Sequence, residues 1–240
     1  DWVVSFDLNS LYPHLIMQYN ISPETLQDTR HPSATVDKIL NEELTFEMYK
    51  DSAVCANGAM YRKDVRGFLP ELMEKIYKDR TIYKKKMLQA KQDYEKTPTK
   101  ALEKEIARCN NIQMARKIQL NSAYGAIGNQ YFRYYKLANA EAITLSGQVS
   151  IRWIENRMNG YLNKLLQTEE EDYVIASDTD SIYLNMGPLV DKFFSGKSGD
   201  KTAIVSILDK ICEDKLEPFI EQSYTKLANY VQAYEQKMIM

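Results

Sequence analysis

The stretch "VIASDTDSIYLNM", residues 174–186, places two acidic residues between two apolar runs. The segments "DYVIAS" and "SIYLNM" are typical of two β-strands joined by a tight turn. Asp178 and Asp180 then lie at a hairpin tip, and side chains two apart in an extended segment point to the same side. Asp is common in turns for conformational reasons alone. A divalent cation between the carboxylates would cancel their repulsion, because Mg²⁺ prefers oxygen ligands.

The composition is that of a globular intracellular protein with a sizeable core. The chain has 240 residues, of which 44% are apolar, and this length suits one large domain or two small ones. Three widely spaced cysteines without a CxxC pair predict reduced thiols and no zinc site. No apolar run reaches the roughly 18 residues of a membrane span. The chain has neither a secretory signal nor an initiator Met, so we expect a piece of a longer chain.

Positive charge is concentrated in one part of the chain. Residues 75–117 contain thirteen Lys or Arg and five Asp or Glu, a net charge of +8, whereas the whole chain carries −2. A basic segment within an acidic chain indicates an element that meets an anion. The alternative is a solvated helical hairpin with no ligand.

The periodicity predicts an α+β fold, with a small antiparallel sheet backed by helices and a projection of two antiparallel helices. The segment "WVVSFDL" (2–8) is typical of a strand that ends near Asp7, and Asn57-Gly58 predicts a second hairpin. We expect a flexible loop over 193–201. Helices are expected over about 70–92, 100–124, 138–166 and 203–238, the last with a kink at Pro218.

Two details of the helices follow from the same patterns. An apolar stripe on the first long helix is predicted from the spacing of Leu72, Ile76, Tyr83 and Met87. The second helix is expected to end at "GAIGN" (125–129), because glycine often terminates helices.

Other polar residues accompany the acidic pair. Asp7 could join the two acids if its strand lies beside the hairpin. Lys117, Asn121 and Tyr124 are spaced i, i+4 and i+7 and share one helix face, where they could contact a phosphate, a sugar and a base. Arg80 and Lys84 are spaced i and i+4, and a shared phosphate would remove their mutual repulsion. Each residue taken alone also has a purely structural interpretation. It is the joint arrangement of these residues, and not any single one, that favours function.

These segments resemble the family B (alpha-like) DNA polymerases, most closely the replicative type of tailed phages. "DLNSLYP" (7–13) is similar to motif A of that family, "KIQLNSAYG" (117–125) to motif B and "SDTDSIY" (177–183) to motif C. "GFLPELMEKIYKDR" (67–80) resembles the start of the fingers. The motif order also matches, and the resemblance covers nearly all of the chain.

The resemblance implies two-metal nucleotidyl transfer, in which deoxynucleotides are added to a primer 3′-OH under the direction of a template. It implies that Asp7 and Asp180 bridge two Mg²⁺ ions, and that Leu8 offers a backbone carbonyl to a metal. Asp178 would improve the metal geometry.

The resemblance also assigns residues to the incoming nucleotide. Ser10 and Leu11 would hold the triphosphate by backbone N–H groups, and Tyr12 would be a steric gate under the deoxyribose. Tyr124 and Gly125 would pack against the nascent base pair and the template.

The basic residues complete this set. Arg80 and Lys117 would bind the triphosphate, with Lys84 and Asn121 assisting. Two positions depart from the family pattern. Ser177 replaces the usual Gly before motif C, and we expect it not to need a positive φ. His14 stands where phage relatives have a small hydroxyl residue, and could reach a phosphate or pack as a surface or core residue.

The implied organisation is palm (1–69), fingers (70–125) and palm again (126–240), without the exonuclease and thumb. We therefore expect a segment of a larger or split polymerase that acts with its remaining domains in cis or in trans. The implied partners are primer–template DNA, deoxynucleoside triphosphates and a sliding clamp, in a bacterial host cytoplasm if the gene is phage-encoded. Two alternatives stay open, a metal-dependent glycosyltransferase and a catalytically silent nucleic-acid-binding module.

Overall fold

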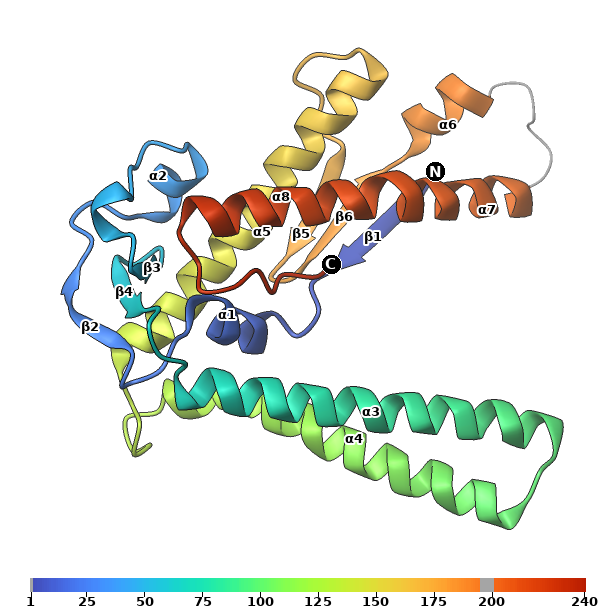
Figure 1. Ribbon diagram of the computed structural model, residues 1–240. Helices are drawn as coiled ribbons and strands as arrows, with labels where there is room; N and C mark the ends of the chain where they lie inside the picture. The colour runs from blue at the N-terminus through green and yellow to red at the C-terminus, as the bar shows by residue number, and fades with distance from the viewer. Residues whose placement is uncertain (1, 195–200) are drawn as a thin grey trace.

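The computed structural model of the chain describes residues 2–194 and 201–240. Helices and antiparallel strands are mixed along the chain, so the predicted α+β class is confirmed (Figure 1). Across the described ranges, no helix is both long and apolar enough to cross a membrane. Most of the loop predicted over 193–201 lies outside the described residues.

The first sheet joins the strand predicted at the start of the chain to the hairpin predicted over residues 174–186. Its strands are β1 (Val3–Asp7), β6 (Ser181–Asn185) and β5 (Val174–Asp178), in the antiparallel order β1-β6-β5. Phe6 and Ile182 point into the core, whereas Val3 is half exposed on the other face. The alternation read from the sequence therefore places one face of this sheet against helices.

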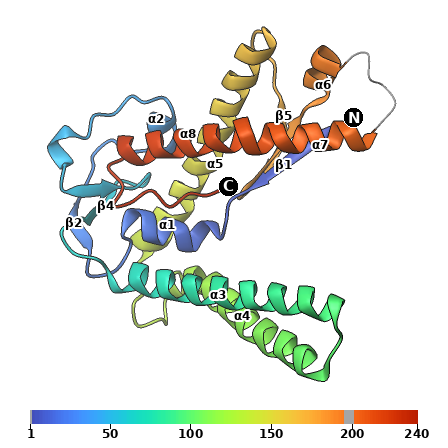
Figure 2. The same ribbon diagram turned by 45° about the vertical axis from the view of Figure 1, so that its right-hand side comes forward.

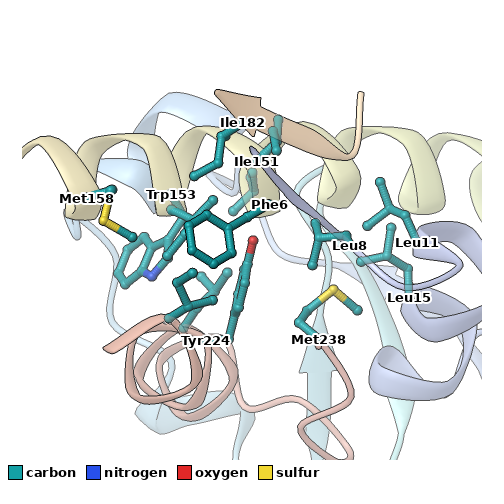
Figure 3. Close-up of a cluster of buried hydrophobic side chains, with 14 of the residues drawn as sticks. Phe6, Leu8, Leu11, Leu15, Ile151, Trp153, Met158, Ile182, Tyr224 and Met238 are labelled. Atoms are coloured by element: carbon teal, nitrogen blue, oxygen red, sulfur yellow. The ribbon is translucent and has the colours of Figure 1, made fainter. Parts of the chain in front are cut away.

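Helices α5 (Leu137–Leu166) and α8 (Glu217–Tyr230) supply the packing partners of that face. Trp153 and Tyr224 lie against Phe6 and Ile182 in a single apolar cluster (Figure 3). The Trp153 indole N–H donates to the Ser223 carbonyl at 2.9 Å, so the two helices are also joined by a buried hydrogen bond. This core packs against one face of the sheet and leaves the end that carries Asp7 and Asp178 outside the apolar cluster.

A second three-stranded sheet was not predicted. It contains β2 (Leu26–Arg30), β4 (Ala59–Arg62) and β3 (Ser52–Val54), in the order β2-β4-β3. The predicted hairpin at Asn57-Gly58 is confirmed as the β3–β4 connection, and Gly58 has φ 79°. The short helix α2 (Val36–Leu40) and a 3₁₀ turn (Glu47–Tyr49) lie between β2 and β3.

The predicted helical hairpin is confirmed and projects away from both sheets (Figures 1 and 2). It consists of α3 (Phe68–Lys96) and α4 (Lys100–Ile127), and the Thr99 hydroxyl caps α4 by accepting the N–H of Leu102 at 3.2 Å. Met73, Met87 and Cys109 are buried along the hairpin, whereas its Lys side chains are mostly exposed.

The predicted apolar stripe of α3 is confirmed in part, since Met87 is buried. Leu72 was wrongly included, because it is 44% exposed and the buried ridge of α3 runs through Leu69 and Met73 instead. The expected end of the second helix at "GAIGN" (125–129) is confirmed: α4 runs to Ile127, a little beyond Tyr124, and Gly128 is its C-cap. Gly128 has φ −79°, so the helix ends without a left-handed glycine.

The C-terminal part differs from the single helix expected over 203–238. After α6 (Gly187–Phe194), the chain forms α7 (Lys201–Ile211), a π-helical turn (Cys212–Leu216) and then α8, with Pro218 in the first turn of α8. The helix ends at Tyr230, and residues 231–240 return alongside α1 (Leu11–Tyr19).

This returning segment is held by contacts with α1, with the loop after β1 and with α3. The Lys237 N–H donates to the Gln18 side-chain oxygen at 3.0 Å, and the Asn9 N–H donates to the Ile239 carbonyl at 2.9 Å. The Lys237 ammonium also lies 3.4 Å from the Glu74 carboxylate. A continued helix could not make these contacts, which explains why helical periodicity overestimated the length of α8.

Gly58 and Gly160 provide a matched test of this fold. A Cβ at Gly58 would lie 2.7 Å from the His31 carbonyl oxygen, whereas a Cβ at Gly160 in α5 meets no atom within 4 Å. We expect Gly58→Ala to lower the free energy of unfolding by about 1–3 kcal/mol. Gly160→Ala should raise it by about 0.5–1 kcal/mol, because Ala favours helix. Urea unfolding measures both, and equal stability of the two variants would contradict the assigned turn.

Candidate functional site

The acidic hairpin tip is tighter than an extended segment. Asp178 is the last residue of β5, while Thr179 and Asp180 form the turn before β6. Thr179 has φ 42°, and the Asp180 N–H donates to the Asp178 carbonyl. The expectation that both acids lie in extended backbone was therefore wrong, since a two-residue hairpin turn needs a positive φ. Ser177 lies in β5 paired with Ile182, so it does not occupy the left-handed position, as expected.

Asp7 lies beside this turn because β1 and β5 both pair with β6. The register places Asp7 opposite Ser181 from one side and Asp178 opposite Ser181 from the other. The Leu8 N–H donates to the Asp180 carbonyl at 2.7 Å, which closes the end of the sheet. Neighbouring strands are about 4.8 Å apart. The structure therefore brings Asp7, Asp178 and Asp180 to one end of one sheet.

The electrostatics of this end are unfavourable for the protein alone. Burial raises the pKa of Asp180, and the Asp7 carboxylate and then Asp178 raise it further. In the part of the chain that the structure describes, no Lys or Arg forms an ion pair with these acids. Like charges without a counter-ion favour binding of a cation.

The available donor atoms suit a hard divalent cation. Carboxylates and main-chain carbonyls are the ligands of Mg²⁺, which usually keeps several waters or substrate oxygens. Leu8 is 1% exposed, and its side chain lies in the core (Figure 3). Its main chain lies at the acidic end, because the Leu8 N–H donates to the Asp180 carbonyl. Within the described ranges, no group of three or more His, Cys, Asp or Glu side chains is arranged to hold a metal by itself. It is therefore the chemistry of the donor atoms, and not their arrangement, that indicates a site for Mg²⁺.

A pocket of about 230 Å³ adjoins the acidic end. The first turn of α1 forms one wall, and the N–H groups of a first helical turn have no partner within the helix. The Ser10 backbone is left-handed, with φ 46° and ψ 58°, where α1 begins. The residues around the pocket are Ser10, Leu11, Tyr12, Pro13, Asn121, Thr179 and Asp180.

Tyr12 and Tyr124 bring two of the motifs into contact. Their ring centroids are 4.6 Å apart with an interplanar angle of 46°. A Cβ on Gly147 of α5 would lie 3.7 Å from the Tyr12 ring, so Gly147 leaves space beside that ring. Burial raises the pKa of Tyr12, with further contributions from Tyr124 and Asp180. The paired rings of Tyr12 and Tyr124 thus lie near the acidic end of the sheet.

The basic residues are placed differently. Lys84 and Lys117 are exposed on the helical hairpin, and Arg80 is partly buried. Among the described residues, the buried Arg80 Nε has no hydrogen-bond partner. The structure does not bring Arg80, Lys84 or Lys117 into the pocket wall. Gly125 is exposed within α4 and also lies outside that wall.

Sequence reasoning missed two wall residues of the pocket. Thr179 and Pro13 border it, although neither was given a role. Both lie inside the quoted motifs, and that position was the only signal available in the sequence.

Comparison with known proteins agrees with the motifs. The model of DNA polymerase family B matches residues 1–227. The DNA-directed DNA polymerase of Escherichia phage RB69 is 34% identical, over all of this chain and 31% of its own length. That of Enterobacteria phage T4 is 33% identical with the same coverage, and the DNA polymerase delta catalytic subunit of Drosophila melanogaster is 28% identical over 78% of this chain and 16% of its own length. The chain thus spans about a third of the phage relatives.

The repulsion at the acidic end predicts a stability effect. A raised folded-state pKa means that ionised Asp180 is disfavoured by folding, so stability falls as pH rises through the carboxyl range. Without divalent ions, Asp180→Asn should therefore raise the melting temperature at pH 7 by about 3 °C. The gain should vanish at acidic pH, where Asp180 is protonated.

Differential scanning fluorimetry across pH checks this prediction, with the exposed Asp28→Asn in β2 as control. Millimolar Mg²⁺ should stabilise the unchanged chain more than Asp180→Asn. A variant that melts below the unchanged chain at pH 7 without metal would show that the acids do not repel each other.

Proposed function

The chain belongs to DNA polymerase family B, and from that premise we propose that it is the catalytic segment of a template-directed DNA polymerase. The proposed reaction adds deoxynucleotides to a primer 3′-OH. The single observation that carries the proposal is the convergence of Asp7, Asp178 and Asp180 beside a pocket that opens on the start of α1.

The acids would hold two Mg²⁺ ions. Asp7 and Asp180 would bridge them, the Leu8 carbonyl would add a ligand, and Asp178 would support the arrangement. Two such ions would lower the pKa of the primer hydroxyl and offset charge on the pyrophosphate leaving group. The uncompensated charge around Asp180 supports this assignment.

The pocket would take the sugar and triphosphate of the nucleotide. Backbone N–H groups of Ser10 and Leu11 at the start of α1 suit an anion. Tyr12 would lie under the deoxyribose, where its ring would collide with a 2′-OH. Asn121 borders the same pocket and would assist. Tyr124, in contact with Tyr12, and Gly125 would pack against the nascent base pair.

The helical hairpin α3–α4 would act as fingers, and the rest of the chain as the palm (1–69 and 126–240). Arg80, Lys84 and Lys117 lie on this hairpin outside the pocket wall. We infer that closure of the fingers (70–125) brings them to the β- and γ-phosphates, where positive charge stabilises phosphoryl transfer. The unpartnered Arg80 Nε supports a role that needs a ligand.

The proposed partners are primer–template DNA, the remaining polymerase domains in cis or in trans, and a sliding clamp, in the cytoplasm of a bacterial host if the gene is phage-encoded. Phosphate contacts dominate affinity for duplex DNA. The remaining domains would supply part of these phosphate contacts, so the 240-residue chain alone should hold primer–template weakly.

The two alternatives have less support. A glycosyltransferase would have a βαβ nucleotide-binding domain with parallel strands, whereas the strand pairs of both sheets in the described residues are antiparallel. A silent module would be free to lose its carboxylates, yet all three are present and lie at one end of a sheet.

Asp180→Asn should lower nucleotide incorporation by about a thousandfold or more, because it removes a bridging carboxylate from the proposed two-metal site. Primer extension with the remaining domains supplied measures the rate, and Asp28→Asn is the matched control. Normal incorporation by Asp180→Asn would refute the metal role. Mg²⁺-dependent binding of a sugar nucleotide in preference to a deoxynucleotide would favour the glycosyltransferase.

Tyr12→Ala should admit ribonucleotides, because the space beneath the sugar opens. We expect the preference for deoxynucleotides to fall at least about tenfold, the equivalent of roughly 1.4 kcal/mol of discrimination. Tyr12→Phe keeps the ring and should keep the preference. Single-nucleotide incorporation with dATP and ATP measures both variants, and unchanged selectivity in Tyr12→Ala would contradict the steric gate.

A further inference from the structure

His14 connects the pocket to the helical hairpin. It lies on α1, is 3% exposed, and its Nδ1 is 3.0 Å from the Ser10 carbonyl oxygen. Its ring meets the Tyr77 ring of α3 edge-on, with centroids 4.6 Å apart at 85°. One buried side chain therefore contacts both the turn that opens the pocket and the first helix of the hairpin. The sequence-based option of a packed histidine is confirmed.

The backbone at Ser10 needs support. An N-cap residue usually has extended backbone and caps the helix with its side chain, whereas Ser10 is left-handed and makes no side-chain cap bond. The left-handed region is unfavourable for a residue other than glycine and persists where surrounding contacts hold it. The Ser10 carbonyl accepts the His14 N–H at 3.2 Å and also lies within reach of the His14 ring.

The chemistry of this contact fixes the ring's role. A carbonyl only accepts, so the His14 Nδ1 must carry the proton and donate. Burial lowers the pKa of His14, against the opposing effect of its hydrogen bond to Ser10, and nearby Lys237 lowers it further. A neutral ring with its proton on Nδ1 is therefore the form that satisfies the site.

We propose that His14 is a positioning residue for the nucleotide pocket. Its Nδ1–H holds the Ser10 turn so that the first N–H groups of α1 face a deoxynucleoside triphosphate, and its ring makes this turn sensitive to the position of α3. The proposal rests on the proposed function, since it assigns the pocket to a nucleotide.

Two variants separate the hydrogen bond from the ring. His14→Phe keeps a ring against Tyr77 but loses the donor, whereas His14→Asn keeps a donor near the Nδ1 position but loses the ring. His31 supplies matched controls, because it is a second histidine, 9% exposed, that packs against Phe46 and Tyr49 away from the pocket. Melting temperatures of His14→Phe, His14→Asn, His31→Phe and His31→Asn show whether each variant folds.

The dissociation constant of the 240-residue chain for a non-hydrolysable deoxynucleoside triphosphate with Mg²⁺ is the readout. His14→Phe should weaken binding about fivefold, within the range expected for one lost hydrogen bond. His14→Asn should stay within about twofold of the unchanged chain, and the His31 variants should bind normally while lowering the melting temperature. Rescue by Asn would not occur if His14 acted only by filling space.

Normal binding by His14→Phe, or equal weakening by His14→Asn and His14→Phe, would overturn the positioning role while leaving the proposed function intact. Failure of the unchanged chain to bind any deoxynucleotide with Mg²⁺ would overturn both. Nitrogen-15 spectra of the histidine ring give a readout independent of binding: a proton on Nδ1 supports the hydrogen bond, and one confined to Nε2 contradicts it.

Discussion

The pairing of β1 with β6 is the constraint on which the site depends. It joins the beginning of the chain to a hairpin near residue 180, and the bond from the Leu8 N–H to the Asp180 carbonyl closes its end. Because side chains alternate along a strand, burying Phe6 places Asp7 on the opposite face. A slip of one residue would bury Asp7 and expose Phe6. Register, set by the core, therefore decides where the acid lies.

That arrangement concentrates negative charge where the protein offers no counter-ion among the described residues. The apolar core beneath the sheet offsets the free-energy cost of this repulsion, because Trp153 and Tyr224 pack there against Phe6 (Figure 3). Buried hydrogen bonds from these two residues also join α5 to α8. Functional sites commonly sacrifice local stability in this way. The left-handed backbone at Ser10 and Thr179, which both border the pocket, is a second instance of local strain.

Local patterns predicted the elements that local physics controls. Alternating residues gave β1 and the β5–β6 hairpin, and helical periodicity gave the α3–α4 hairpin. The strand β2, "LQDTR", was missed because only its first residue is apolar, and its pairing with β4 is irregular. The end of α8 was misplaced because residues 231–240 are held by distant partners such as Gln18. For the site, the motifs predicted the acids and the residues of α1, but only the fold shows that Lys117 lies outside the pocket wall while Asn121, on the same helix, borders it.

The most direct test is whether one bound cation contacts both β1 and the hairpin. Mn²⁺ can replace Mg²⁺ at oxygen sites and broadens nearby NMR signals. Substoichiometric Mn²⁺ should broaden the amide signals of Leu8, Asp180 and Ser181 together, while that of Asp28 in the second sheet stays sharp. Equal broadening of Asp180 and Ser181 in the unchanged chain and in Asp7→Asn would contradict a site shared by Asp7 and the hairpin.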